Sequence, residues 1–336
     1  MSRPNDTVSP KANSAVSHRR TAVSDPTECP RRWLCSTRLQ PVTHIVRLAL
    51  GLGIVALVGG CGPDEPAYLG KSLSQWEPQL KAESPEDRVA AVEALTAMGT
   101  RAVPAVPALT EALNDSDARV RLAAIEVLDR LAQGGHVRAT PIAALLDDED
   151  DAVRARAAEA IGRSGEANEQ VIASLVKLLE DRSAATRLAA ARAIQRLDPN
   201  AQQPMPVLIQ LLGEQDAAIR AEAAGGLVPF GIAAKEAVPA LVKLLEDETV
   251  PARQQAALAL AAMGSEAVSA RAALIKAIEA STSPGECLAE ARALALSGAA
   301  AKEAIPLLRK QPAKYPRLMD FAKAIEEIAQ AIESSQ

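Results

Sequence analysis

The sequence predicts an all-α fold, a solenoid of about eight antiparallel helix pairs with a period of about 33 residues. Hydrophobic residues make up 48% of the 336 residues but aromatic residues only 2%. The core must therefore be built from Ala, Leu, Val and Ile, which favours closely packed helices. In addition, one arginine recurs once in every period, and apolar residues around it recur at helical spacing. A fixed period of this length is typical of arrays of stacked units.

A column of arginines marks the repeat. Six consecutive members follow one another at the same interval without an insertion: Arg88, Arg121, Arg154, Arg187, Arg220 and Arg253. An alanine stands three residues after each arginine, and a Leu or Ile stands seven residues after it. In the seventh repeat the register places Glu286 in the arginine column, whereas the alanine is kept as Ala289. Three matching columns over six repeats exclude a coincidence of composition.

Helix boundaries follow from the same register. Four residues before the arginine position stands a Ser, Asp or Thr, the types that accept hydrogen bonds from the free amides of a helix start. These predicted N-caps are Ser84, Asp117, Asp150, Ser183, Asp216, Thr249 and Thr282. Four glycines are expected to end helices: Gly99, Gly165, Gly231 and Gly264. A further apolar helix follows each turn, often with proline in its first turn. The unit is thus two antiparallel helices.

The link between the helices also has a pattern. Leu145-Leu146-Asp147-Asp148 ends one helix, and Asp150-Asp151-Ala152-Val153-Arg154 opens the next. This pattern resembles the HEAT repeat family, in particular the HEAT-like repeats of phycobilisome lyases. The resemblance covers residues 69–333 and implies a right-handed solenoid whose second helices, those with the arginines, line a concave face. Trp76 in the first helix pair and Phe321 in the last are expected to cover the two ends.

The segment before the repeats predicts an export signal. Residues 1–47 form a basic, polar extension that is disordered or precedes the true start codon, and residues 48–61 carry an uncharged apolar run that ends in Gly-Gly-Cys. This ending resembles the lipobox of bacterial lipoproteins, which implies lipidation of Cys61. Residues 62–68 are expected to be a short linker. The expected location is the periplasmic or outer side of a bacterial membrane.

The charge of the exported part restricts its partners. Residues 62–336 contain 29 basic and 39 acidic residues, a net charge of −10. This balance argues against nucleic acid and anionic lipid surfaces as partners. Attachment to the membrane is therefore expected through the lipid anchor alone.

A second column, of acids, stands six residues before the arginines. Its members are Asp115, Asp148, Asp181, Glu214 and Asp247. In the seventh repeat both the acid and the arginine are missing, which indicates that the two charges pair. We expect a structural ladder that links neighbouring turns. The alternative, a row of arginines that binds anions, would not require the acids.

The remaining polar candidates favour surface roles. Arg130, Arg163, Arg192 and Arg196 fall on the exposed side of the second helices, where they form a possible interaction face for an acidic partner segment. His136 is expected in a solvated loop, and Cys287 on the solvent side of its helix without a histidine to activate it. The acidic run 147–151 lacks the glycine and distal glutamate of an EF-hand loop. No catalytic, cofactor or metal site is predicted.

These observations favour a lipid-anchored scaffold or adaptor that binds an unknown protein partner on the concave face, with no small-molecule substrate. One alternative, an enzyme accessory similar to the lyases, rests only on the repeat subtype. A weaker one, a nucleic-acid-binding HEAT protein, conflicts with the acidic charge. A partner cannot be named from the fold alone.

Overall fold

The computed structural model describes residues 67–166 and 168–335. All described residues belong to one unit of the chain, Gly60–Gln336. The predicted extension, the signal and Cys61 lie outside the described residues.

The described residues form eight helix pairs, which confirms the predicted all-α solenoid. The first helices, several of which begin or end as 3-10 helix, are α1 with η1 (Leu73–Trp76, Glu77–Lys81), η2 with α3 (Gly99–Ala105, Val106–Ala112), η3 (Thr140–Asp147), α6 (Glu169–Leu178), α8 (Pro204–Leu211), η4 with α10 (Val228–Ala237, Val238–Leu244), η5 with α12 (Gly264–Ala270, Arg271–Ala280) and η6, α14 and η7 (Gly298–Ala304, Ile305–Lys310, Gln311–Lys314). The second helices are α2 (Pro85–Met98), α4 (Ala118–Gln133), α5 (Asp151–Ser164), α7 (Ala184–Leu197), α9 (Ala217–Leu227), α11 (Val250–Met263), α13 (Pro284–Ala295) and α15 (Met319–Ser334).

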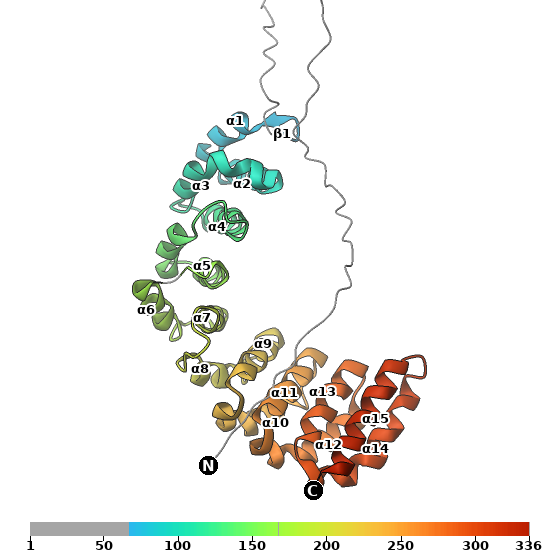
Figure 1. The fold of residues 1–336 in the computed structure, drawn as a ribbon. Helices are drawn as coiled ribbons and strands as arrows, with labels where there is room; N and C mark the ends of the chain where they lie inside the picture. Colours follow the sequence, from blue (N-terminus) through green and yellow to red (C-terminus); the bar gives the residue numbers. More distant parts are fainter. Residues whose placement is uncertain (1–66, 167, 336) are drawn as a thin grey trace, which may run out of the picture. The chain divides into compact units, whose positions relative to one another are not determined.

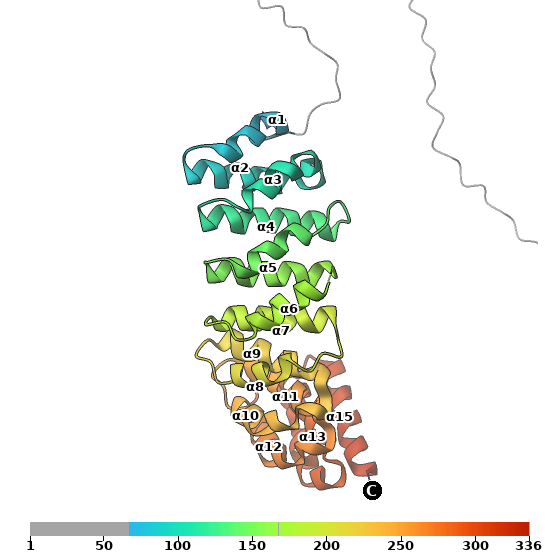
Figure 2. The ribbon, with the colours of Figure 1, turned by 90° about the vertical axis from the view of Figure 1, so that its left-hand side faces the viewer.

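The two sets of helices form two layers. In Figure 1, α2, α4, α5 and α7 follow one another in one layer, with α3, α6 and α8 in the other, and Figure 2 shows the successive second helices stacked as rungs. Each pair packs on its neighbours, as α5 does on α4 and α7. Fully buried aliphatic side chains, such as Leu95, Leu128 and Ile161 seven residues after their arginines, fill the space between the layers. The second layer therefore presents one exposed face, which we call the second-helix face.

A short β-hairpin precedes the first helix pair. Strands β1 (Ala67–Tyr68) and β2 (Lys71–Ser72) pair antiparallel. The turn between them places Leu69 at φ +50° and Gly70 at φ +76°. The hairpin contacts the buried Trp76, whose Nε1 donates a hydrogen bond to the Tyr68 carbonyl at 3.0 Å. Two residues of the predicted linker thus belong to the folded end of the array.

The last helix pair also buries an aromatic ring. Phe321 on α15 is 4% exposed and meets Tyr315 edge to face, with 5.2 Å between the ring centroids. Ile325, Ala329 and Ile332 continue the buried stripe of α15 at helical spacing. Trp76 and Phe321 therefore lie buried at the two ends of the described array, where the aliphatic core has a neighbouring repeat on one side only.

Most predicted helix boundaries hold, but one N-cap was wrong. Gly99, Gly165 and Gly264 follow the last residues of α2, α5 and α11 and have positive φ. The predicted N-cap Thr282 is displaced by Ser283, whose hydroxyl accepts a hydrogen bond from the Glu286 amide. The reason lies in Glu286, whose carboxylate occupies the turn and accepts hydrogen bonds from the amide and hydroxyl of Thr282.

Residues Pro85–Ala112 are long and apolar enough for a membrane span, with a mean hydropathy of 1.2. In the fold they are not one straight rod, because Gly99 at φ +59° separates α2 from the helix that follows. Both halves pack against α4. Their apolar residues are therefore accounted for by the solenoid core.

Candidate functional site

The repeated arginines sit where two neighbouring repeats meet. Arg154 shows the arrangement: its Nε and Nη2 donate to the two carboxylate oxygens of Asp181 in the next repeat, at 2.8 and 3.0 Å. Its Nη1 donates to the carbonyls of Asp148 and Glu149 in the turn before its own helix, at 2.8 and 3.1 Å. One guanidinium thus joins the turn of its own repeat to the equivalent turn of the following repeat.

The same connection recurs through the array, with nitrogen–oxygen distances of 2.6–2.8 Å. The pairs are Arg88–Asp115, Arg121–Asp148, Arg154–Asp181, Arg187–Glu214 and Arg220–Asp247. Each aspartate of the column also accepts the amide of the residue two positions later, which fixes the turn. The structure therefore brings together the arginines and acids of the predicted ladder.

The ladder has one more pair than the sequence indicated. Arg253 donates to Glu286, which stands in the arginine column of the next repeat and is only 1% exposed. The loss of the usual acid at Ala280 is thus compensated by an acid one helical turn into α13. The sequence does carry a sign of this pair. In the seventh repeat the arginine column holds an acid, Glu286, rather than a neutral residue.

The four arginines of the predicted interaction face lie on second helices, each in a different setting. Arg130 on α4 pairs with Glu126 one turn earlier. Arg163 on α5 reaches the buried Asp129 of α4 at 2.7 Å and Glu159 at 3.4 Å. Arg192 on α7 pairs with Glu222 of α9. Among the described residues, Arg196 alone of these four has no ion pair.

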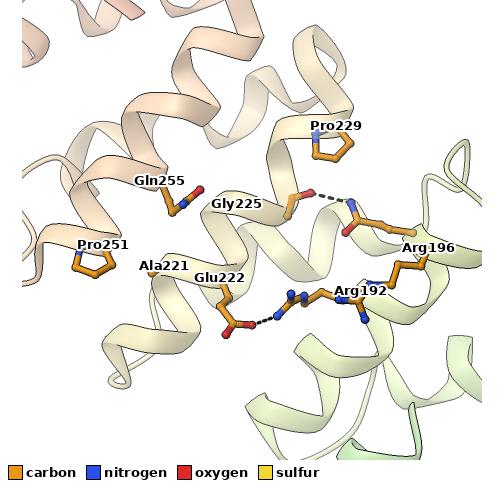
Figure 3. A pocket seen from close by; sticks show the side chains of 10 residues that line it. Arg192, Arg196, Ala221, Glu222, Gly225, Pro229, Pro251 and Gln255 are labelled. Carbon is orange, nitrogen blue, oxygen red and sulfur yellow. Dashed lines mark hydrogen bonds and ion pairs between the residues drawn. The ribbon is translucent and has the colours of Figure 1, made fainter. Parts of the chain in front are cut away.

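A hollow of about 530 Å³ opens on this face between α7, α9 and α11. Its polar lining includes Arg192, Arg196, Glu222 and Gln255, shown in Figure 3. Ala221, Gly225, Pro229 and Pro251 supply the apolar part of the wall. Sequence reasoning did not find this hollow, although it did select two of the arginines that line it.

Comparison with known families settles what the repeats are. A profile described as HEAT repeats matches residues 73–143, 139–205 and 205–297, which together span most of the described chain. The chain belongs to the HEAT repeat family. The resemblance predicted from the sequence is thereby confirmed. A comparison with curated proteins gave no match.

Solved structures share the fold of this HEAT chain. An engineered protein is 24% identical over 79% of this chain and 79% of its own, with a TM-score of 0.55. The Escherichia coli protein YibA is 18% identical over 78% of this chain and 92% of its own, with a TM-score of 0.56. The complex of CpcE and CpcF of phycocyanin lyase from Nostoc is 18% identical over 83% and 99%, with a TM-score of 0.42. At these identities the likeness concerns the fold alone.

The other polar residues singled out from the sequence lie in an exposed loop, in ion pairs or at a helix cap. His136 is exposed in the loop between α4 and η3. In the acidic run, Asp147 pairs with Lys177, Asp148 with Arg121, and the Asp150 side chain caps α5. No group of three or more His, Cys, Asp or Glu side chains within the described residues is placed to hold a metal ion.

The prediction for Cys287 was wrong, because this residue is fully buried. Lys314, the last residue of η7, and Tyr315 after it lie close enough to Cys287 to interact electrostatically with it. Burial raises the pKa of the Cys287 thiol to about 11, so the thiol is protonated and unreactive at neutral pH.

Glu290, one turn after Glu286 on α13, is a buried carboxylate without a partner. It is 0% exposed, and neither of its oxygens has a hydrogen bond from the described residues. Burial, followed by the negative charge of Glu286, raises its pKa to about 8. The other repeats place Val92, Ile125 or an alanine at this position, four residues after the arginine column. Glu290 is therefore a polar exception in an apolar column of the core.

Proposed function

We propose that this HEAT chain is a lipid-anchored scaffold at the bacterial cell envelope that binds a protein partner on its second-helix face. The observation that carries the proposal is the distribution of charge between the two sides of the second helices. The ladder arginines are largely buried and committed to neighbouring turns. Arg130 and Arg192 lie on the exposed face in ion pairs that solvent reaches, and Arg196 lines the hollow beside them.

The stacked geometry also favours a protein partner. HEAT repeats contact mainly their neighbours, so the array offers a long, open surface rather than one enclosed cleft. The second-helix face combines acidic and basic positions, since Glu126, Glu159 and Glu222 lie beside the arginines. Such a mixed surface suits selective recognition of a complementary protein surface.

Photo-crosslinking in intact cells tests the scaffold role. p-Benzoylphenylalanine is placed at Arg130 on the second-helix face, and separately at Lys177 on α6 in the first layer as a matched exposed control. We expect a discrete adduct from position 130 and none from position 177. Equal adducts from both positions, or none from position 130, would refute a binding role for the second-helix face.

The lipid anchor has its own test at Cys61. Replacing Cys61 with serine removes the thiol that would carry the acyl chains, and membrane attachment by acylation requires that chemistry. We expect the variant to leave the membrane fraction or to remain unprocessed, while the wild-type protein stays in the membrane with an acyl mass. Mass spectrometry of fractionated cells measures both. A soluble wild-type protein without acyl mass would contradict the anchor.

A further inference from the structure

The hollow between α7 and α9 can be traced to one side chain on α7 and to missing side chains on α9. One repeat earlier, Gly162 on α5 lies directly against Ala193 on α7, so close that a Cβ on Gly162 would stand 2.7 Å from the Ala193 Cα. Gln195 replaces this glycine in the next repeat, eight residues after the arginine column. Its amide donates to the Gly226 carbonyl at 2.7 Å. The glutamine side chain therefore stands between helices that would otherwise touch.

The helix contacts follow this substitution. α7 packs closely on α5, and α9 on α11, whereas α7 and α9 contact each other much less. Figure 1 shows the change of direction between α7 and α9. Two glycines, Gly225 and Gly226, add no side chains to fill the gap that remains. The opening is thus built into the sequence at one junction of the array.

Arg196 lines this opening, and the repeat register gives it neither of the two acidic partners that the corresponding arginines have among the described residues. Nine residues after the arginine column, Arg130 and Arg163 each have a glutamate one turn earlier, Glu126 and Glu159. The same position before Arg196 holds Arg192. Arg163 also reaches back to Asp129 of the preceding repeat, but the corresponding residue for Arg196 is Gly162.

The charges around the hollow leave one positive charge uncompensated. Arg156 and Arg163 share Glu159 and Asp129, and Arg192 is held by Glu222. Partial desolvation, together with the positive charges of Arg192 and Arg163, lowers the pKa of Arg196. An arginine stays protonated at physiological pH, so this environment is one that an anion would stabilise.

We propose that the hollow between α7, α9 and α11 is a specific binding site for a carboxylate side chain of an acidic peptide segment, with Arg196 as the group that binds it. A carboxylate fits better than a phosphate dianion because Glu222 would repel the second negative charge. Ala221, Pro229 and Pro251 offer apolar contact to an aliphatic neighbour of the acid. The volume, about 530 Å³, is within the range of small-ligand sites. The proposal deepens the scaffold function, on which it rests.

Peptide binding tests the site with a matched pair of variants. The probe is a fluorescein-labelled pool of short peptides with Glu and Leu at random positions, and a second pool has Gln in place of Glu. In fluorescence anisotropy we expect the wild-type chain to bind the Glu pool more tightly. Arg196→Gln should weaken this binding by about tenfold or more, the effect of one charge-assisted hydrogen bond. Lys177→Gln, which removes an exposed positive charge from α6 in the first layer, should leave it unchanged.

Several results would overturn the site. These are equal binding of the two pools, equal losses from Lys177→Gln and Arg196→Gln, or displacement of the Glu pool by inorganic phosphate at concentrations where acetate has no effect. Glu222→Gln frees Arg192 and is expected to strengthen binding of the Glu pool. A further result is successful crosslinking at position 130 together with an Arg196→Gln variant that binds the pool as the wild type does. That result would refute the binding site in the hollow and leave the scaffold proposal intact. If crosslinking also fails, the scaffold itself is refuted.

Discussion

Replacing Arg154 with alanine is expected to destabilise the chain by about 3–5 kcal/mol, the cost of breaking a buried ion pair by removing one partner. Arg154 is 7% exposed and donates four hydrogen bonds, two to Asp181 and two to backbone carbonyls. The substitution leaves Asp181 in the interface without its counter-charge and frees both carbonyls. Urea denaturation followed by circular dichroism measures the loss, and hydrogen exchange should place it first in α5 and α7.

The pH dependence of this loss has a defined sign. Burial alone would raise the pKa of Asp181, but the hydrogen bonds from Arg154 and from the Ser183 amide, together with the positive charges of Arg154 and Arg182, outweigh it and hold the pKa below its usual value of 3.8. A lowered folded-state pKa contributes stability above the unfolded-state pKa and loses it as the pH falls through the folded value. The difference between wild type and Arg154→Ala should therefore shrink below about pH 4.

An exposed ion pair provides the control for Arg154. Lys177 pairs with Asp147 at 2.8 Å, but both side chains are more than 60% exposed. Such pairs contribute about 0–1 kcal/mol, so Lys177→Ala should barely change the unfolding transition. Unchanged stability in Arg154→Ala would contradict the structural role of the ladder, and a selective loss of partner binding would favour the row of arginines that binds anions.

The fold could be predicted because each repeat carries its own copy of the same local signals. The arginine column, the alanine three residues later and the N-cap before them recur at one spacing, so an error in one repeat is corrected by the others. The regular columns of arginines and acids could predict a ladder, but the joint loss of the two in the seventh repeat does not identify the partners, because Arg253 is kept and pairs with Glu286. Their connection from one repeat to the next required the structure, because spacing alone does not say which neighbouring turn an arginine reaches.

The errors lie where a single repeat departs from the pattern. Cys287 occupies a column that is half-exposed in several other repeats, but in the seventh it is fully buried, with Lys314 and Tyr315 of the last helix pair close by. Thr282 is not the N-cap of α13, because its backbone amide donates a hydrogen bond to the Glu286 carboxylate. The hollow depends on Gln195 in place of a glycine, a change that looks like an ordinary polar substitution in the sequence. Only the packing of α7 against its two neighbours shows its effect.

Glu290→Gln is expected to stabilise the chain at alkaline pH, and the gain should grow steadily between about pH 5 and pH 8. Below the unfolded-state pKa, near the ordinary value of 4.5, the carboxyl is neutral in both the folded and the unfolded chain. As the pH rises toward 8, the unfolded chain loses this proton while the folded chain keeps it. The free energy of unfolding of the wild type therefore falls across this range.

Above pH 8 the penalty reaches a plateau, because both states are then ionised. One pKa unit corresponds to about 1.4 kcal/mol, so the plateau can reach about 5 kcal/mol. Arg253 and Lys314 oppose the rise in the Glu290 pKa, and Glu286 adds to it, so all three stay unchanged in the variant. Urea denaturation of wild type and Glu290→Gln at several pH values gives the difference, with the exposed Glu279→Gln as the control. A stability difference between wild type and Glu290→Gln that does not change between pH 5 and pH 9 would contradict this prediction. It would show that Glu290 is already ionised in the folded chain at pH 5, and such a buried charge would need a partner that the described residues do not supply.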